Sequence, residues 1–216
     1  GVMYVLAFWT AWFKLPGLGK ISGVSLSRDQ WTNIVSWGGL GVLVGGRLGY
    51  ALFYEPLYFL QSPIELFFIW NGGMSSHGGF IGAALGVWWA TRSPFLTKER
   101  LGEVSDVLTV PVALGLALGR IGNIINQEFG MYPYYEAIGD VCIAVICYVL
   151  LRRRGTTFPV FLLLYSILRF FLECVRPQDW PLVFGLSRGQ LLTIPLFIGA
   201  VILLKNANKR RISETI

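Results

Sequence analysis

Seven long apolar runs constrain the fold of this chain more than any other feature of its sequence. They cover residues 1–13, 31–54, 74–91, 104–125, 135–151, 156–174 and 187–204. A helix needs about 20 apolar residues to cross the hydrocarbon core of a bilayer, and only 14% of the residues are charged. The runs therefore predict an all-α, polytopic transmembrane bundle of about seven helices, forming a single membrane-embedded domain over residues 1–216. The first run is too short to span alone and is expected to be the second half of a truncated helix.

The positions of the lysine and arginine residues predict the orientation of the bundle. Of the 18 such residues, thirteen follow runs 1, 3 and 5 or lie in the tail, two lie on the opposite side, and three lie inside runs. Because cytoplasmic loops carry the excess of positive charge, the C-terminal tail is expected in the cytoplasm. The same distribution explains the net charge of +6 without a nucleic-acid partner.

Three arginines lie within the apolar runs and point to a functional site. Arg47, Arg120 and Arg169 each occupy the later part of an inside-to-outside run, which places all three toward the outer leaflet. A buried arginine is costly in a membrane, so each either pairs with a carboxylate or binds an anionic ligand. Their common depth favours a shared anionic ligand. The pattern around Arg47, Gly46–Tyr50, recurs around Arg120 as Gly119–Asn123.

The end of the fourth run carries a cluster of polar side chains. Arg120, Asn123 and Gln127 fall on one helical face, and Asn126 and Glu128 follow the same helix end. The planar guanidinium of an arginine suits a phosphate because it donates two parallel hydrogen bonds. This cluster could grip a polar lipid headgroup, or the amides could simply cap the carbonyls of their own helix.

The sixth run and the only histidine add further candidates. Tyr165, Arg169 and Glu173 are four residues apart and share one face, so Arg169 and Glu173 could form a structural ion pair or orient a guanidinium toward a ligand. His77 lies in a glycine-rich turn at the predicted outer side, where it could act as a general base or as a structural hydrogen-bonding group. The three cysteines lie in apolar runs without metal-type spacing, which argues against a metal site.

The motifs together resemble those of the bacterial prolipoprotein diacylglyceryl transferase family. The stretches that carry the likeness follow the same order over nearly the whole chain: Gly45–Tyr50, Asn71–Gly79, Gly119–Asn126 with Glu128, Tyr165–Glu173 and Ser187–Gln190.

The resemblance implies a multi-pass enzyme of the bacterial inner (cytoplasmic) membrane that uses no metal or organic cofactor. Such enzymes transfer the diacylglyceryl group of phosphatidylglycerol to the lipobox cysteine thiol of a preprolipoprotein and release glycerol phosphate. By resemblance, His77, Arg120 and Arg169 are the catalytic candidates. The residues expected to bind substrate are Arg47, Tyr50, Asn123, Asn126, Glu128, Tyr165 and Glu173.

The chain departs from the family pattern after Glu128. Only residues 129–132 separate Glu128 from Pro133, where the family has a much longer extracytoplasmic segment, and the motif that follows survives as Tyr132–Glu136 without its histidine. We therefore expect an intact lipid-handling core with a reduced region for the protein substrate. The alternatives to the transferase are a non-catalytic protein that binds or transports an anionic lipid, and a degenerate homologue that serves as a chaperone or scaffold.

Overall fold

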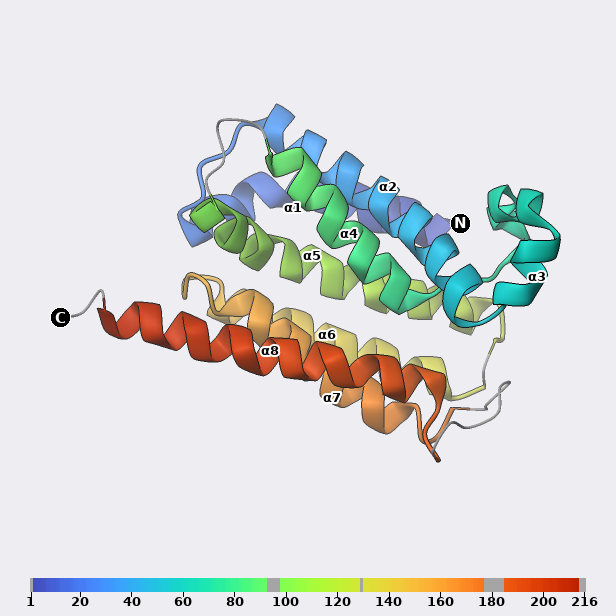
Figure 1. The fold of residues 1–216 in the computed structure, drawn as a ribbon. Coiled ribbons are helices and arrows are strands. Elements are labelled where there is room, and N and C mark those ends of the chain that lie inside the picture. Colours follow the sequence, from blue (N-terminus) through green and yellow to red (C-terminus); the bar gives the residue numbers. More distant parts are fainter. Residues whose placement is uncertain (1, 93–97, 129, 177–184, 214–216) are drawn as a thin grey trace. The chain divides into compact units, whose positions relative to one another are not determined.

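The computed structural model describes residues 2–92, 98–128, 130–176 and 185–213, and helices dominate these residues (Figure 1). One long helix corresponds to each of the seven apolar runs, which confirms the predicted all-α class. Ser93-Pro94 and Pro177, in the connections expected after the runs 74–91 and 156–174, lie outside the described residues. The long helices are α1 (Val2–Ser22), α2 (Arg28–Phe53), α4 (Ser76–Thr91), α5 (Lys98–Ile125), α6 (Tyr132–Leu150), α7 (Thr157–Leu172) and α8 (Arg188–Ser213).

Length and composition mark several of these helices as membrane spans. Among the described residues, three segments are both long and apolar enough to cross a bilayer, namely Leu101–Ile125, Tyr132–Leu150 and Arg188–Lys209, while Thr157–Leu172 is apolar but shorter. The bundle exposes many large apolar side chains, such as Val149 and Phe171. Such surfaces are expected where lipid rather than water surrounds a helix.

The first helix differs from the prediction. The first apolar run ends at residue 13, and Pro16-Gly17 in the following joint is a pair typical of a turn, but α1 continues through Pro16 to Ser22. Backbone groups that leave a helix find no water in a bilayer, so a membrane helix tolerates an internal proline more readily than it unwinds. Pro111 and Pro195 also lie inside helices. Lys14 and Lys20, which were assigned to a loop, therefore belong to α1.

Three short helical segments after α2 were also absent from the predicted set. They are α3 (Pro56–Gln61) and the 3-10 helices η1 (Pro63–Phe67) and η2 (Ile69–Asn71). Two prolines start the first two of these segments, at positions where a missing backbone N–H costs nothing. The segments connect α2 to α4 and precede the glycine-rich turn that carries His77.

The chain divides into two compact units, and each is described separately. The two-helix unit is Ser27–Thr97, with α2 and α4, and the five-helix unit is Gly1–Leu26 with Lys98–Ile216. The prediction of one domain over residues 1–216 stays a prediction.

Glycine residues bring α2 and α4 of the two-helix unit into direct backbone contact. A Cβ atom added to Gly49 would lie 2.6 Å from the Cα atom of Gly78, and one added to Gly41 would collide with the carbonyl of Gly82. Gly86 meets the carbonyl of Trp37 in the same way. The small residues therefore let the two helix backbones touch along most of their shared length.

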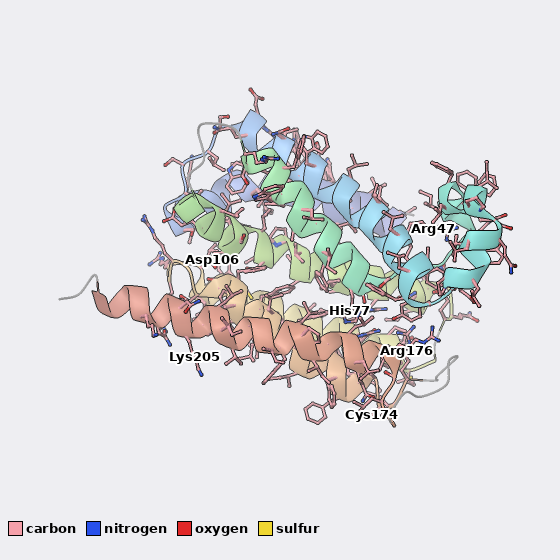
Figure 2. The ribbon with its side chains drawn as sticks, in the orientation of Figure 1. Arg47, His77, Asp106, Cys174, Arg176 and Lys205 are labelled. Carbon is pink, nitrogen blue, oxygen red and sulfur yellow. The ribbon has the colours of Figure 1, made fainter. Side chains whose placement is uncertain are left out.

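In the five-helix unit, α5 packs against α1, α6 and α7, and α7 packs against α6 and α8. At one end, the buried carboxylate of Asp106 accepts hydrogen bonds from the backbone N–H groups of Gly155 (2.5 Å) and Phe158 (2.7 Å). Asp106 thereby joins α5 to the N-terminus of α7. Figure 2 labels Asp106 and Arg176 at opposite ends of this unit, and the end near Arg176 holds the predicted site residues.

Candidate functional site

A buried carboxylate, Glu136, joins two of the predicted site arginines. The Nε atom of Arg120 on α5 lies 2.7 Å from one oxygen of Glu136. The guanidinium of Arg169 on α7 contacts the other oxygen of the same carboxylate. Glu136 is 4% exposed and lies near the start of α6, just after its first turn, so three helices contribute one charge each to a single bridge. The shared carboxylate offsets part of the charge of both buried cations.

Arg169 is the more deeply enclosed of the two arginines. Besides Glu136, it donates a hydrogen bond of 2.7 Å to the hydroxyl of Tyr132 and forms an ion pair of 3.0 Å with Glu173. The Tyr132 hydroxyl in turn donates to Glu136 at 2.8 Å. The Nε–H of Arg169 has no hydrogen-bond acceptor among the described residues. One donor of this buried guanidinium is thus available to an additional acceptor.

Glu173 connects this network to α8. Arg176 approaches its carboxylate at 3.8 Å and also lies over the ring of Tyr132. A Cβ atom added to Gly189 would lie 2.7 Å from the Glu173 carboxyl group, so the absence of a side chain there lets the carboxylate reach the N-terminus of α8. That end of a helix carries partial positive charge and favours an anion.

Asp140 supplies a third carboxylate, one helical turn beyond Glu136. It is 3% exposed and interacts electrostatically with both Arg120 and Arg169. Three arginines, at positions 120, 169 and 176, thus lie together with three buried acidic residues, at positions 136, 140 and 173. We call these six residues the arginine cluster.

The polar side chains at the end of α5 bind one another. Glu128 accepts hydrogen bonds from Asn123 at 2.5 Å and from Asn126 at 3.1 Å. Asn123 also accepts a long contact of 3.4 Å from Arg120. Gln127 has a positive φ of 58°, the left-handed conformation that commonly terminates a helix. The amides thus hold the Glu128 carboxylate near Arg120, and in these contacts they do not cap their own helix.

Tyr165 lies one turn before Arg169 on α7. The side chain is 3% exposed and interacts electrostatically with Arg169 and Arg120. Its ring is roughly parallel to that of Phe161, at 6.0 Å between centroids. Tyr165 therefore forms part of the buried wall behind the two arginines.

The remaining predicted residues belong to the two-helix unit. Arg47 is buried and donates hydrogen bonds to backbone carbonyls of the segment 65–73, beginning with a 2.5 Å bond to Glu65 (Figure 2). The ring of Tyr50 stacks on Tyr54 and contacts Phe59 edge-on. His77 is 4% exposed in the first turn of α4, two residues after the N-cap residue Ser75.

The structure thus brings together the predicted residues of the five-helix unit: Arg120, Asn123, Asn126, Glu128, Tyr165, Arg169 and Glu173. Arg47, Tyr50 and His77 gather in the other unit, around the start of α4. Their contact with the arginine cluster stays a prediction.

Sequence reasoning missed Glu136, Tyr132 and Asp140 as members of the site. The first two were noticed only as the remnant of a motif. A signal was available, because Glu136 and Asp140 are the two acidic residues of the run 135–151 and lie four residues apart. Acidic residues inside a membrane helix almost always have a partner or a function, and pairing them with Arg120 and Arg169 would have predicted the bridge.

The chemical capacity of the arginine cluster is anion binding. Guanidinium groups in apolar surroundings bind phosphate strongly because little water screens them. The side chain of Arg120 is 19% exposed, so it is the more accessible of the two bridged arginines. Within the described ranges, no group of three histidine, cysteine, aspartate or glutamate residues is placed to hold a metal ion.

Comparison with known proteins gives one consistent result. A family described as prolipoprotein diacylglyceryl transferase matches residues 1–205. A phosphatidylglycerol–prolipoprotein diacylglyceryl transferase of Oleidesulfovibrio alaskensis is 37% identical, over 97% of this chain and 88% of the relative. Proteins of the same description from Pseudoalteromonas atlantica and Pseudomonas entomophila are 35% and 34% identical, over 100% and 98% of this chain and 87% and 89% of their own lengths.

Proposed function

Because this chain belongs to the prolipoprotein diacylglyceryl transferase family, we infer that it is a membrane transferase that moves the diacylglyceryl group of phosphatidylglycerol onto a prolipoprotein. The family match covers residues 1–205, which includes every candidate site residue. We propose that the acceptor is the thiol of a lipobox cysteine and that glycerol phosphate is the second product.

The observation that supports this assignment most strongly is the bridge at Glu136. Two guanidinium groups from different helices converge on one carboxylate, which is an anion with two oxygens, as a phosphodiester is. A lipid phosphate that displaces part of this bridge would find two guanidinium groups already brought together. We therefore propose that Arg120 and Arg169 bind the phosphate of phosphatidylglycerol.

The reaction then follows from ordinary nucleophilic chemistry. The acceptor thiol loses its proton, for which His77 is the proposed base, because the thiolate is the reactive form. The thiolate sulfur attacks the glycerol carbon that carries the phosphate, a carbon–sulfur bond forms, and the carbon–oxygen bond breaks. The departing phosphate takes the electron pair, and the two arginines stabilise its growing negative charge.

The other predicted substrate-binding residues support this arrangement in the same proposal. Asn123 and Asn126 hold Glu128 beside Arg120, and Glu173 holds Arg169. Tyr165 packs in the buried interior next to Arg169, while Tyr50 and Arg47 lie in the two-helix unit with His77. The groups that contact the lipid directly are expected among the more exposed of these, with Arg120 first.

Reconstitution tests the function. The full chain in vesicles that contain phosphatidylglycerol is mixed with a lipobox peptide, and release of glycerol phosphate is measured together with the mass of the peptide. We expect equal amounts of both products, and none with a peptide whose cysteine is replaced by serine. Lipid binding without product would instead favour a non-catalytic lipid-binding protein.

We further propose that the protein lies in the bacterial inner membrane with its tail in the cytoplasm. The basis is the excess of lysine and arginine at one set of helix ends, including Lys205 and Lys209 in α8, because cytoplasmic segments carry the excess of positive charge. In a variant with Ser213→Cys and the three native cysteines replaced by serine, the new thiol should resist a membrane-impermeant reagent in intact cells. Ready labelling of the new thiol would contradict the proposed orientation and place the tail outside the cytoplasm.

A further inference from the structure

Every N–H donor of the Arg47 guanidinium is occupied by a backbone carbonyl. The Nε atom donates to Leu66 at 3.3 Å, one terminal nitrogen donates to Gly72 and Gly73, and the other donates to Glu65 and Phe68. A guanidinium has five N–H donors, so no donor is left for a ligand while these bonds hold. All five acceptors lie within residues 65–73, which we call the outer loop.

The acceptors of Arg47 are neutral. Within the part of the chain that the structure describes, no carboxylate forms an ion pair with this arginine. The ring of Phe59 lies over the guanidinium, with its centroid 5.0 Å from Cζ, and Arg47 is 5% exposed. Carbonyl dipoles of the outer loop and the aromatic face of Phe59 therefore surround the buried Arg47 guanidinium.

The outer loop leads directly to the start of α4. Ser75 donates its backbone N–H to the carbonyl of Gly46 at 2.9 Å, the residue before Arg47, and its side chain caps α4 by accepting from Gly78. The loop packs closely against α2 at Gly73, where a Cβ atom would lie 2.6 Å from the ring of Tyr50 and 3.1 Å from the Arg47 guanidinium. Residues 46–50 of α2 thus fix both the loop and the helix end that bears His77.

From this geometry we infer that Arg47 is a positioning residue: it folds the outer loop around its guanidinium and so fixes His77 at the start of α4, and it does not bind the lipid phosphate. The role in turnover rests on the proposed transferase function. The role in loop structure rests on the hydrogen bonds alone. The sequence-based expectation of a direct substrate contact for Arg47 is replaced by this proposal.

The first test replaces Arg47 with lysine. Arg47→Lys keeps the charge but offers three donors from one nitrogen in place of five from a planar fork. We expect backbone hydrogen exchange in residues 65–75 to accelerate about tenfold or more, while exchange in α5 to α8 is unchanged. We also expect kcat to fall about tenfold with the dissociation constant for phosphatidylglycerol unchanged. Arg28→Lys, at the other end of α2, is the matched control.

A second pair of variants disturbs the loop and keeps Arg47. Gly72 and Gly73 both have positive φ, 83° and 77°, but a Cβ atom meets neighbours only at Gly73. Each alanine variant places a side chain at a positive φ and so strains the backbone, and Gly73→Ala adds an overlap with Tyr50 and Arg47. We therefore expect Gly73→Ala to accelerate exchange across the loop and lower kcat as Arg47→Lys does, and Gly72→Ala to have a clearly smaller effect.

The outcomes separate this inference from the proposed function. Unchanged loop exchange in Arg47→Lys together with weaker phosphatidylglycerol binding would overturn the inference and make Arg47 a ligand contact. If Arg47→Lys fails to fold, the glycine pair decides, and equal behaviour of Gly72→Ala and Gly73→Ala overturns the inference. A wild-type protein that releases no glycerol phosphate would refute the transferase, while hydrogen exchange would still test the loop.

Discussion

Arg47 and Arg120 lie in similar pentapeptides, which share three of five residues, but their surroundings differ. Arg47 is held by neutral carbonyls of the outer loop, whereas Arg120 meets the carboxylate of Glu136, which it shares with Arg169. The flanking glycines differ as well. Gly46 and Gly49 are packed tightly against Met74 and Gly78, while nothing lies within 4 Å of a Cβ atom at Gly119.

The difference shows that the hydrogen-bond and ion-pair partners of a buried arginine indicate whether it has a structural or a ligand-binding role. Carbonyls of a folded loop cannot leave without unfolding the loop, so an arginine that they saturate is part of the structure. A carboxylate on a neighbouring helix neutralises charge and can share or exchange its place with another anion. We therefore expect the cluster around Glu136 to respond to anionic ligands and the Arg47 environment to remain unchanged.

The largest effect is expected from removal of the shared carboxylate. Glu136→Ala leaves Arg120 and Arg169 without their common partner, and loss of one member of a buried ion pair costs about 3–5 kcal/mol. The free energy of unfolding should fall by this order, and glycerol phosphate release should fall about a hundredfold or more. Glu103→Ala, which removes a partly exposed pair with Arg154, should change little. An active, stable Glu136→Ala variant would show that the bridge does not organise the site.

The next largest effect is expected from Arg169→Lys. Lysine keeps the charge but cannot serve Glu136, Glu173 and Tyr132 from one planar group. Loss of a well-placed donor to a developing charge costs about 3 kcal/mol, so turnover should fall roughly a hundredfold while phosphatidylglycerol binding weakens less. Single-turnover rates and lipid dissociation constants measure the two effects. Equal losses in both would mean that Arg169 only holds the lipid, and Glu173→Gln shows whether pairing with Glu173 diverts the lysine.

A smaller effect is expected from Tyr132→Phe. The change removes the hydroxyl that accepts from Arg169 and donates to Glu136 but keeps the ring beneath Arg176. Hydrogen bonds to charged groups contribute about 1.5–3 kcal/mol, so kcat should fall about tenfold. Tyr134→Phe, at an exposed position of the same helix, is the matched control. If both variants behave alike in the release assay, the hydroxyl has no part in orienting the bridge.

The smallest effect is expected from Gly189→Ala. The new methyl group would overlap the Glu173 carboxyl group, which is the end of a flexible side chain and can shift. We expect turnover to fall about threefold, since Arg169 loses alignment with Glu173 but keeps Glu136 and Tyr132. Gly199→Ala on the same helix meets nothing within 4 Å and should leave turnover unchanged. A Gly189→Ala variant indistinguishable from Gly199→Ala would exclude Glu173 from the alignment of Arg169.

The helices were largely predictable because apolar runs of membrane length have few alternatives to a helix. Their ends were less predictable: α1 continues through Pro16, and α5 and α8 extend into basic residues that the apolar pattern excludes. The convergence of Arg120 and Arg169 followed from their depth. The segment Pro56–Asn71 was missed because it is too short and too irregular to produce a periodic pattern.

The proposed positioning role of Arg47 could not be predicted from the pattern of side chains in the sequence. In the sequence, its predicted depth and its flanking glycines match those of Arg120, so the pattern predicts the same anionic ligand for both. The acceptors that distinguish it are backbone carbonyls, which every residue carries and no sequence motif marks. Glu136 was missed for the opposite reason, since the acidic residue was visible but its two partners lie on different helices.

The direct backbone contact between α2 and α4 has a genetic consequence. Every amino acid other than glycine carries a Cβ atom, so any missense change at Gly41, Gly82 or Gly86 places an atom where a neighbouring backbone already lies. No conservative replacement exists at these codons. A compensating substitution elsewhere changes a side chain and cannot remove the backbone atoms that the new Cβ atom would meet. In a saturation mutagenesis library selected for function, we therefore expect no variant with a substitution at these three positions to survive, not even alanine or serine.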